Sequence, residues 1–275
     1  MPELPEVETV VRGLRPALSG RVITGVWLDW PNCLIFPPPE DFAAQIAGQT
    51  IRQLWRRGKY ILADLDTATL IIHLKMTGRL YVVPDADHNE ADRWVHFRFQ
   101  LDNAHQLRFS DARKFGRVYL TPDPALVIGR LGPEPLADDF TLDRFLERLA
   151  GRRGALKPLL LDQSFVAGIG NIYADEALFR AGLHPQQEAG SLNAREQALL
   201  YASIRAALAA GIDHEGASVN WYRKPDGTPG ESQEYFYVYG RTGEPCRRCG
   251  TPITRLVVGG RSTHICPACQ PLHSG

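Results

Sequence analysis

Four of the five cysteines lie near the C-terminus as two Cys-x2-Cys pairs, separated by sixteen residues. They are Cys246, Cys249, Cys266 and Cys269. Four thiolates at this spacing can surround a zinc ion tetrahedrally, and a structural site of this kind has no open position for catalysis. Because the chain lacks the features of a secreted protein, a metal site is favoured over disulfides. The spacing therefore predicts one structural Zn²⁺.

The segment between the two cysteine pairs has the pattern of a β-hairpin. Two β-type runs, 254–258 and 261–265, flank the turn dipeptide Gly259-Gly260. Arg261 is therefore expected at or just past the tip of a hairpin that the zinc holds together. On its own this module indicates only a zinc ribbon, which occurs in binding proteins and in enzymes alike.

Positive charge is concentrated in two segments, although the chain has 31 basic and 31 acidic residues and no formal net charge. Residues 144–157 contain five basic side chains and one acid, and residues 240–275 contain five arginines and one acid. The net charge alone argues against a protein that binds nucleic acid. Local potential, however, determines where a polyanion docks, so these two segments keep that class of partner open.

Hydrophobic periodicity predicts the elements that must position these residues. Apolar residues at three- and four-residue steps predict an amphipathic helix over 3–18, with Pro2 at the first helical position. Between about 21 and 120, short β-type runs separated by turns predict a sandwich or a barrel. A Pro- and Gly-rich stretch over 131–139 resembles a linker. The helices expected after it cover 142–150, 156–162, 171–180 and 194–210.

The composition, with 44% hydrophobic and 23% charged residues, is that of an ordinary globular protein. No apolar run is long enough to span a membrane, and the N-terminus lacks the basic and apolar regions of a secretion signal. We therefore expect a cytoplasmic protein that is cut at most by removal of Met1.

Several short motifs occur together along the chain. They are Pro2-Glu3-Leu4-Pro5-Glu6-Val7-Glu8-Thr9, Arg57-Gly58-Lys59-Tyr60, His73-Leu74-Lys75-Met76-Thr77-Gly78, Asp111-Ala112-Arg113-Lys114-Phe115-Gly116, Leu131-Gly132-Pro133-Glu134-Pro135-Leu136, Gly168-Ile169-Gly170-Asn171-Ile172-Tyr173 and Tyr239-Gly240-Arg241. With these motifs and the zinc hairpin, the chain closely resembles bacterial formamidopyrimidine-DNA glycosylases over its whole length. Several motifs in the right order are far more specific than any one of them alone.

The resemblance implies an α+β fold in four parts. An N-terminal helix and a β-sandwich would form a catalytic domain over 1–130, followed by a linker over 131–140. A helical domain with a helix–two-turns–helix element and a base-capping loop would cover 141–235, and a β-hairpin zinc finger would cover 236–275. The implied activity is that of a bifunctional DNA glycosylase and AP lyase of base excision repair, which removes 8-oxoguanine and formamidopyrimidines. The implied partner is double-stranded DNA with oxidised bases; the protein is expected to be a monomer and to have no membrane partner.

Four residues match the catalytic positions of this family. Pro2, freed by removal of Met1, would attack the sugar C1′ and form a Schiff base. About 10% of an α-amino group is neutral at pH 7, against ~0.04% of a lysine, so a terminal nitrogen is the better nucleophile. Glu3 would protonate the sugar ring oxygen, and Lys59 would supply a proton in β-elimination. Arg261 would hold phosphate and stabilise the transition state of δ-elimination. Without the other motifs, Pro2-Glu3 would indicate only a preferred helix start.

Six further residues match positions that contact DNA. They are His73, Met76, Arg113, Phe115, Arg152 and Asn171. The trio Met76, Arg113 and Phe115 would fill the space left by a flipped-out base, where apolar wedges and an arginine facing the orphaned cytosine make physical sense. Asn171 follows a glycine-rich turn at a helix start, where backbone N–H groups bind anions. The simpler interpretations are a helix cap for Asn171 and a core histidine for His73.

The chain departs from the family pattern at residues 92–95, where many relatives carry a Lys-His-x-His-Val run that includes a DNA contact. The base-capping loop is expected within 217–234, without assigned contacts. Two alternatives stay open: an endonuclease VIII-type enzyme that prefers oxidised pyrimidines, and a zinc-ribbon DNA-binding protein without activity. The trio of wedge residues favours the purine enzyme, and the intact catalytic set argues against the binding protein.

Overall fold

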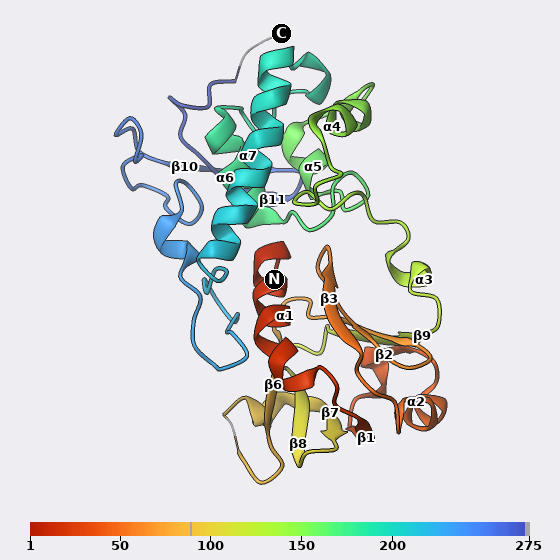
Figure 1. The fold of residues 1–275 in the computed structure, drawn as a ribbon. Coiled ribbons are helices and arrows are strands. Elements are labelled where there is room, and N and C mark those ends of the chain that lie inside the picture. The colour runs from red at the N-terminus through yellow and green to blue at the C-terminus, as the bar shows by residue number, and fades with distance from the viewer. Residues whose placement is uncertain (89, 273–275) are drawn as a thin grey trace. The chain divides into compact units, whose positions relative to one another are not determined.

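The computed structural model describes residues 1–88 and 90–272, which form two compact units. The N-terminal unit contains residues 1–130 and 214–231, and the C-terminal unit contains the described residues of 131–213 and 232–275. Figure 1 shows that the first unit holds most of the strands, whereas the second is mainly helical. The expected α+β fold is confirmed.

The N-terminal unit begins with helix α1 (Leu4–Leu18). Its N-cap is Glu3, whose backbone N–H donates to the Glu6 carboxylate three residues on, and Pro5 occupies the first turn. The sequence placed Pro2 at the first helical position, but the helix starts two residues later because Glu3 has extended backbone angles. The apolar face of α1 is buried in the core of the unit.

Two sheets follow α1. The first is antiparallel in the order β1-β7-β8-β6, and comprises β1 (Ile23–Leu28), β7 (Val95–Leu101), β8 (His105–Asp111) and β6 (Gly78–Pro84). The second has the order β2-β9-β5-β4-β3, with only the β2–β9 pair parallel, and comprises β2 (Leu34–Phe36), β9 (Arg117–Thr121), β5 (Thr69–His73), β4 (Tyr60–Asp64) and β3 (Gln53–Arg57). Short helical segments lie between these strands: η1 (Pro31–Cys33), α2 (Pro39–Ile46) and η2 (Glu90–Trp94). Helix α3 (Ala125–Ile128) follows the last of them, β9.

One hydrophobic core joins the two sheets and α1. Phe97 and Phe109 from the first sheet belong to the same buried cluster as Ile61 and Ile72 from the second, together with Leu14 of α1. Side chains alternate across a strand, so one face of each sheet supplies this core. The β-sandwich expectation is therefore confirmed, and a barrel is not formed because the two sheets have separate strand orders.

Residues 214–231 pack with the N-terminal unit, whereas the sequence analysis grouped them with the helical domain. The backbone N–H of Ala217 donates to the carboxylate of Glu6 at 2.8 Å, and Trp221 contacts Trp94 edge to face. Ala217 also pairs with Glu231 across the neck of the segment. Glu6 and Trp94 lie 211 and 127 positions before their partners, so local sequence could not indicate these two contacts.

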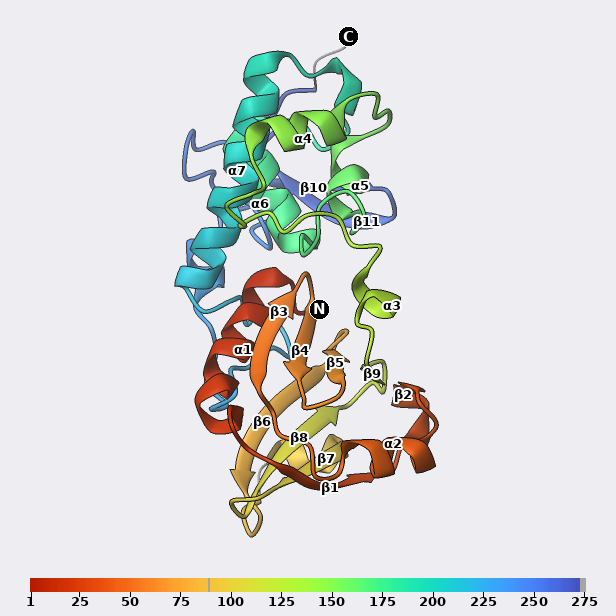
Figure 2. The same cartoon turned by 45° about the vertical axis from the view of Figure 1, so that its right-hand side comes forward.

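The C-terminal unit consists of helices and one hairpin. Its elements are α4 (Leu142–Leu149), α5 (Leu156–Leu161), α6 (Asn171–Ala181), η3 (Ala189–Ser191), α7 (Ala194–Asp213), η4 (Ser232–Tyr235), β10 (Thr254–Val258) and β11 (Arg261–Ile265). Thr141 caps α4, and α6 ends at Gly182 in the left-handed conformation that favours glycine. Helices α6 and α7 lie side by side (Figure 2). The four expected helices and the hairpin are all present.

The expected linker packs closely on the C-terminal unit. Gly132 donates its N–H to the Gln163 carbonyl at 2.8 Å, and a Cβ at this position would lie 2.6 Å from the Phe165 carbonyl oxygen. Arg205 of α7 donates to the carbonyl of Pro135. The glycine is therefore needed for close approach, and the segment is anchored by hydrogen bonds. Among the described residues, no helix combines the length and apolar character that crossing a bilayer requires.

Candidate functional site

The start of α1 is buried and held by one carboxylate. Pro2 and Glu3 are both buried, whereas Met1 is exposed. Oε2 of Glu6 accepts the N–H of Glu3 at 2.8 Å, and Oε1 accepts the N–H of Ala217, also at 2.8 Å. A single side chain thus connects the helix start to the segment 214–231. Glu6 was not among the predicted site residues, although its position three residues after an N-cap is typical of a capping box.

Lys59 lies in the two-residue turn between β3 and β4 and is buried. Its neighbour Gly58 has a φ of 56°, which a left-handed turn requires and glycine adopts without strain. The Arg56 guanidinium donates to Glu8 of α1 at 2.9 Å and to the Gly58 carbonyl at 3.2 Å. This contact ties the turn to α1, and in both views the N-terminus lies beside the β3–β4 turn (Figures 1 and 2).

The Arg56–Glu8 ion pair is partly buried, with an N···O distance of 2.9 Å. Burial by itself would raise the pKa of Glu8, but hydrogen bonds from Arg56 and Arg12 outweigh it and lower the pKa. Glu8 therefore stays a carboxylate at neutral pH and maintains the contact between α1 and the turn that carries Lys59.

His73 ends β5 and is buried beside Tyr60, whose ring it meets edge to face at 4.6 Å. Burial, together with the positive charges of Lys75 and Lys59, lowers the pKa of His73 to about 3. Its Nδ1 accepts the backbone N–H of Lys75 at 2.9 Å, so this nitrogen carries no proton. The neutral ring must then carry its proton on Nε2, which makes that atom a hydrogen-bond donor.

The trio Met76, Arg113 and Phe115 is brought together at one edge of the sandwich. Met76 and Phe115 are 42% and 43% exposed, so both apolar side chains are accessible at the surface. The Arg113 guanidinium lies over the Phe115 ring at 4.6 Å from its centroid. Two loops that are far apart in the sequence thus present two exposed apolar side chains and one cation.

Asp111 organises both loops of this trio and was not singled out by the sequence analysis. Its buried carboxylate accepts the backbone N–H groups of Phe115 at 2.8 Å and Gly116 at 2.7 Å. It also accepts the hydroxyl of Thr77, which in turn accepts the N–H of Arg113 at 3.1 Å. The carboxylate therefore fixes the loop after β8 and the loop before β6 relative to each other.

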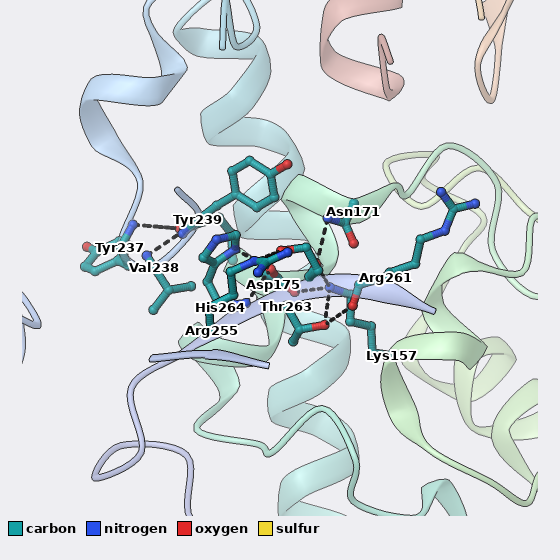
Figure 3. A network of polar contacts seen from close by, with 12 residues as sticks. Lys157, Asn171, Asp175, Tyr237, Val238, Tyr239, Arg255, Arg261, Thr263 and His264 are labelled. Carbon is teal, nitrogen blue, oxygen red and sulfur yellow. Dashed lines mark hydrogen bonds and ion pairs between the residues drawn. The ribbon is translucent and has the colours of Figure 1, made fainter. Parts of the chain in front are cut away.

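Three of the residues predicted to contact DNA or to act in catalysis lie in the C-terminal unit. Asn171 is the first residue of α6, and its side-chain amide donates to the Ser262 carbonyl at 2.9 Å. Arg261, exposed, begins β11, and its side chain extends away from the buried contacts behind it (Figure 3). Arg152 is exposed and donates to the Arg148 carbonyl at 3.3 Å. Asn171 and Arg261 are thus neighbours through Ser262, whereas Arg152 lies apart from this contact.

The four predicted cysteine ligands form one cluster. All four Sγ atoms lie within 4.8 Å of one another. Three of the separations are 4.0 Å for Cys246–Cys269, 3.4 Å for Cys249–Cys266 and 3.5 Å for Cys249–Cys269. A tetrahedral site with Zn–S bonds of about 2.3 Å requires S···S distances of about 3.8 Å. The cluster therefore fits a structural zinc ion and confirms that expectation.

Cys33 is separate from this cluster and is buried in the core of the N-terminal unit. Burial raises the pKa of its thiol to about 12, so the nucleophilic thiolate is absent at neutral pH. Cys33 is therefore a packing residue rather than a nucleophile.

The fold and the site define a class of protein: a β-sandwich with a buried proline at position 2, combined with a helical unit and a four-cysteine zinc finger. Three family models match the chain: the formamidopyrimidine-DNA glycosylase N-terminal domain at residues 1–118, its H2TH domain at 131–222, and the zinc finger found in FPG and IleRS at 243–272. The chain belongs to the formamidopyrimidine-DNA glycosylase family.

Individual relatives match over nearly the whole chain. The formamidopyrimidine-DNA glycosylase of Herpetosiphon aurantiacus is 53% identical over 98% of this chain and 100% of its own length. That of Bacillus subtilis is 44% identical, over 98% and 99% of the two chains. The MutM (FPG) protein of Thermus thermophilus superposes with a TM-score of 0.88 at 40% identity, covering 99% and 100% of the two chains. A Lactococcus lactis FPG variant, in complex with DNA containing Fapy-dG, superposes with a TM-score of 0.91 at 37% identity, covering 98% and 100%.

Replacing Asp111 by Asn should lower the free energy of unfolding of the N-terminal unit by about 2 kcal/mol, because buried backbone donors lose a charged acceptor. Urea denaturation followed by tryptophan fluorescence can measure this, since all five tryptophans lie in that unit. Asp123→Asn is the control: Asp123 also accepts a backbone N–H but is exposed, and its replacement should change stability by less than about 0.5 kcal/mol. Equal effects of the two substitutions would contradict the organising role of Asp111.

His73 should make the N-terminal unit less stable as the pH falls. Its pKa is about 3 in the folded protein and 6.5 in an unfolded chain, so the unfolded state binds more protons between these values. The free energy of unfolding should therefore fall from pH 6.5 downward, with His73 contributing at most about 1.4 kcal/mol per pH unit. His73→Gln should remove that component. Urea midpoints between pH 4 and 7 would show it, and identical slopes for both proteins would refute it.

One zinc ion per chain is expected, bound by the four clustered thiolates. Metal analysis of purified protein should give a stoichiometry of one, which Cys249→Ser or Cys266→Ser should abolish. Cys33→Ser provides the matched control, because Cys33 is buried outside the cluster and should leave the zinc content unchanged. Zinc lost in the control, or retained after loss of a ligand, would show that the assignment is wrong.

Proposed function

We propose that this chain is a bifunctional DNA glycosylase and AP lyase of base excision repair, which removes oxidised purines such as 8-oxoguanine and formamidopyrimidines from duplex DNA. Family membership supports the activity. The main structural support for the mechanism is that Pro2 and Glu3, which directly precede α1, are both buried. Structures with a similar fold include FPG complexes with DNA that contains Fapy-dG or an abasic site. We further propose that the enzyme acts as a monomer in the cytoplasm.

Pro2 is the proposed nucleophile. Removal of the exposed Met1 would leave a secondary amine, which in its neutral form attacks the sugar C1′ while the bond to the damaged base breaks. The base leaves with the bonding electron pair and takes up a proton. The attacking nitrogen then loses its proton, and its lone pair expels the ring oxygen, which takes up a proton and becomes a hydroxyl group, to give an iminium ion. The permanent positive charge of that ion acidifies C2′ and permits elimination of the 3′ phosphate and then of the 5′ phosphate.

Glu3, Lys59 and Arg261 supply the other chemical roles in this proposal. Glu3 would protonate the ring oxygen; its burial favours the neutral acid, although the helix dipole at an N-cap favours the carboxylate. Lys59 would act in β-elimination from its turn beside the N-terminus. Arg261, which keeps its charge at any working pH, would stabilise the departing phosphate in δ-elimination as an electrostatic clamp.

The exposed trio Met76, Arg113 and Phe115 could offset part of the free energy that flipping a base out of the duplex requires. Flipping a nucleotide out of a duplex costs a few kcal/mol, and side chains inserted into the vacated space offset part of it. Met76 and Phe115 are apolar wedges, and Arg113, stacked on Phe115, can donate to the acceptors of the orphaned base. His73 would donate from Nε2 to a DNA phosphate, and Asn171 and Arg152 would make further phosphate contacts.

The segment 217–234 is the proposed base-capping loop. Glu6 holds its start at Ala217 next to Glu3, so the loop is tied to the residue that would protonate the sugar. The Trp94–Trp221 contact connects it to residues 92–95, where this chain departs from the pattern of its relatives.

Incubation with duplex DNA containing 8-oxoguanine, followed by borohydride, should trap a covalent protein–DNA adduct through reduction of the Schiff base. Pro2→Gly should abolish trapping, because the secondary amine that forms the Schiff base is lost. Retention of Met1, verified by mass spectrometry, should abolish it as well. A duplex with an oxidised pyrimidine is the parallel substrate: better trapping there would favour an endonuclease VIII-type enzyme. Full activity with Met1 still attached would overturn the proposed mechanism.

A further inference from the structure

Lys157, on α5, is completely buried, with 0% of its surface exposed. Its ammonium group donates three hydrogen bonds: to Asp175 at 2.6 Å, to the Ser262 carbonyl at 2.9 Å and to the Thr263 hydroxyl at 2.8 Å. A buried ammonium group costs several kcal/mol unless it is paired, and here all three of its donors have acceptors. The charge therefore links α5 to both α6 and β11 (Figure 3).

Asp175, on α6, is 1% exposed and uses both of its oxygens. One binds the Lys157 ammonium group, and the other accepts the backbone N–H of His264 at 2.9 Å. The ion pair thus contacts Ser262, Thr263 and His264, which are the three residues directly after Arg261 in β11. It holds the strand through backbone groups of Ser262 and His264 and through the side chains of Thr263 and His264, whose Nδ1 lies 3.3 Å from Asp175.

The Ser262 carbonyl is shared between the ion pair and Asn171. It accepts from the Lys157 ammonium group and from the Asn171 amide, each at 2.9 Å. The Thr263 hydroxyl, itself bound to Lys157, donates to the Arg261 carbonyl at 3.0 Å. Asn171 and Arg261, two of the three residues proposed to contact phosphate in this unit, are therefore positioned by one set of contacts.

The zinc ion alone cannot set the position of Arg261. Its ligands flank the hairpin at residues 246–249 and 266–269, whereas Arg261 lies at the opposite, turn end. An isolated two-stranded hairpin is marginally stable, so its tip needs a support of its own. At that tip Gly259 lies against Pro158, the residue next to Lys157: a Cβ at Gly259 would come within 2.9 Å of the proline ring.

We propose that Lys157 and Asp175 are positioning residues, which hold the tip of the zinc hairpin so that Arg261 and Asn171 can engage the DNA backbone together. The proposal rests on the proposed function for the role of Arg261. A pair kept for stability alone would be replaceable by apolar side chains, often at no cost. If the pair is kept for position, replacing both of its residues should leave the enzyme folded but displace the hairpin tip that carries Arg261.

The test compares Asp175→Asn with Glu176→Gln. Glu176 is the next residue of α6 and is also buried, but it accepts the N–H groups of Tyr237, Val238 and Tyr239 instead of those of the hairpin. Hydrogen exchange should become faster at the amides of residues 261–264 in Asp175→Asn, with one zinc ion retained, and should stay unchanged there in Glu176→Gln. Unchanged exchange in Asp175→Asn would overturn the proposal.

Enzyme assays then separate position from stability. Asp175→Asn should slow δ-elimination roughly ten- to hundredfold, as expected for a displaced catalytic group, while Schiff-base trapping at Pro2 is maintained. In an Arg261→Ala background the same substitution should have no further effect on δ-elimination. An equal effect in both backgrounds would contradict action through Arg261. If Arg261→Ala alone leaves δ-elimination unchanged, the proposed role of Arg261 fails, whereas hydrogen exchange still decides whether the pair positions the hairpin.

A second variant covers the case in which Asp175→Asn fails to fold because it leaves the Lys157 charge unpaired. Lys157→Met combined with Asp175→Asn removes both charges and keeps an oxygen that can accept the His264 N–H. This double variant should unfold at a temperature close to that of the original protein and bind one zinc ion, yet show the faster hairpin exchange and the slow δ-elimination. Normal exchange and normal elimination in this folded variant would show that the pair does not position the hairpin.

Discussion

The functional segments of this protein are tied to the fold by buried carboxylates that accept hydrogen bonds from backbone N–H groups. Glu6 holds the start of α1 and the segment 214–231, Asp111 holds the loops of the exposed trio, and Asp175 holds the zinc hairpin. A buried carboxylate is costly unless several donors surround it. Each buried carboxylate therefore constrains the loops around it, because they must adopt an arrangement in which all the donors reach its oxygens.

Burial also separates these three acids from the exposed basic residues. The acids just named are inside, where each is compensated locally, whereas Arg113, Arg152 and Arg261 have exposed side chains. Lys157 shows the reverse case, because it belongs to a basic segment of the sequence but is buried and paired. A basic residue in a charged run is therefore not always part of the binding surface, and Lys157 supports such a surface from behind.

Two different devices stabilise the zinc hairpin at its two ends. Metal–thiolate bonds can hold the two Cys-x2-Cys segments, where four sulfurs converge. Hydrogen bonds to the Lys157–Asp175 pair hold the strand that follows the tip. The first device is strong and depends on the metal, whereas the second depends on helices α5 and α6 being in place. The helical unit therefore sets the position of the hairpin. Loss of the metal should affect the cysteine end of the hairpin, and loss of the ion pair should affect its tip.

The amphipathic helix at the N-terminus, the cap at Thr141 and the Gly-Gly hairpin were all predictable, because each depends on residues within a few positions of one another. The zinc ligands were predictable for the same reason, since two Cys-x2-Cys pairs already hold most of the geometry of the site. The catalytic and DNA-contacting residues stay predictions, carried by motifs. The strand β8 is harder to predict from the sequence than these elements. Hydropathy would count its Arg108 as exposed, whereas Arg108 is buried and paired with Asp92.

The sequence by itself thus determined the local elements, the metal ligands and the family. Only the tertiary structure decided that segment 214–231 packs against α1, that Asp111 joins two loops, and that Lys157 faces β11 more than a hundred residues away. The physical reason is the range of the interactions. Periodicity, capping and chelation act between near neighbours in the chain, whereas the partner of a buried charge is set by which distant surfaces the fold brings together.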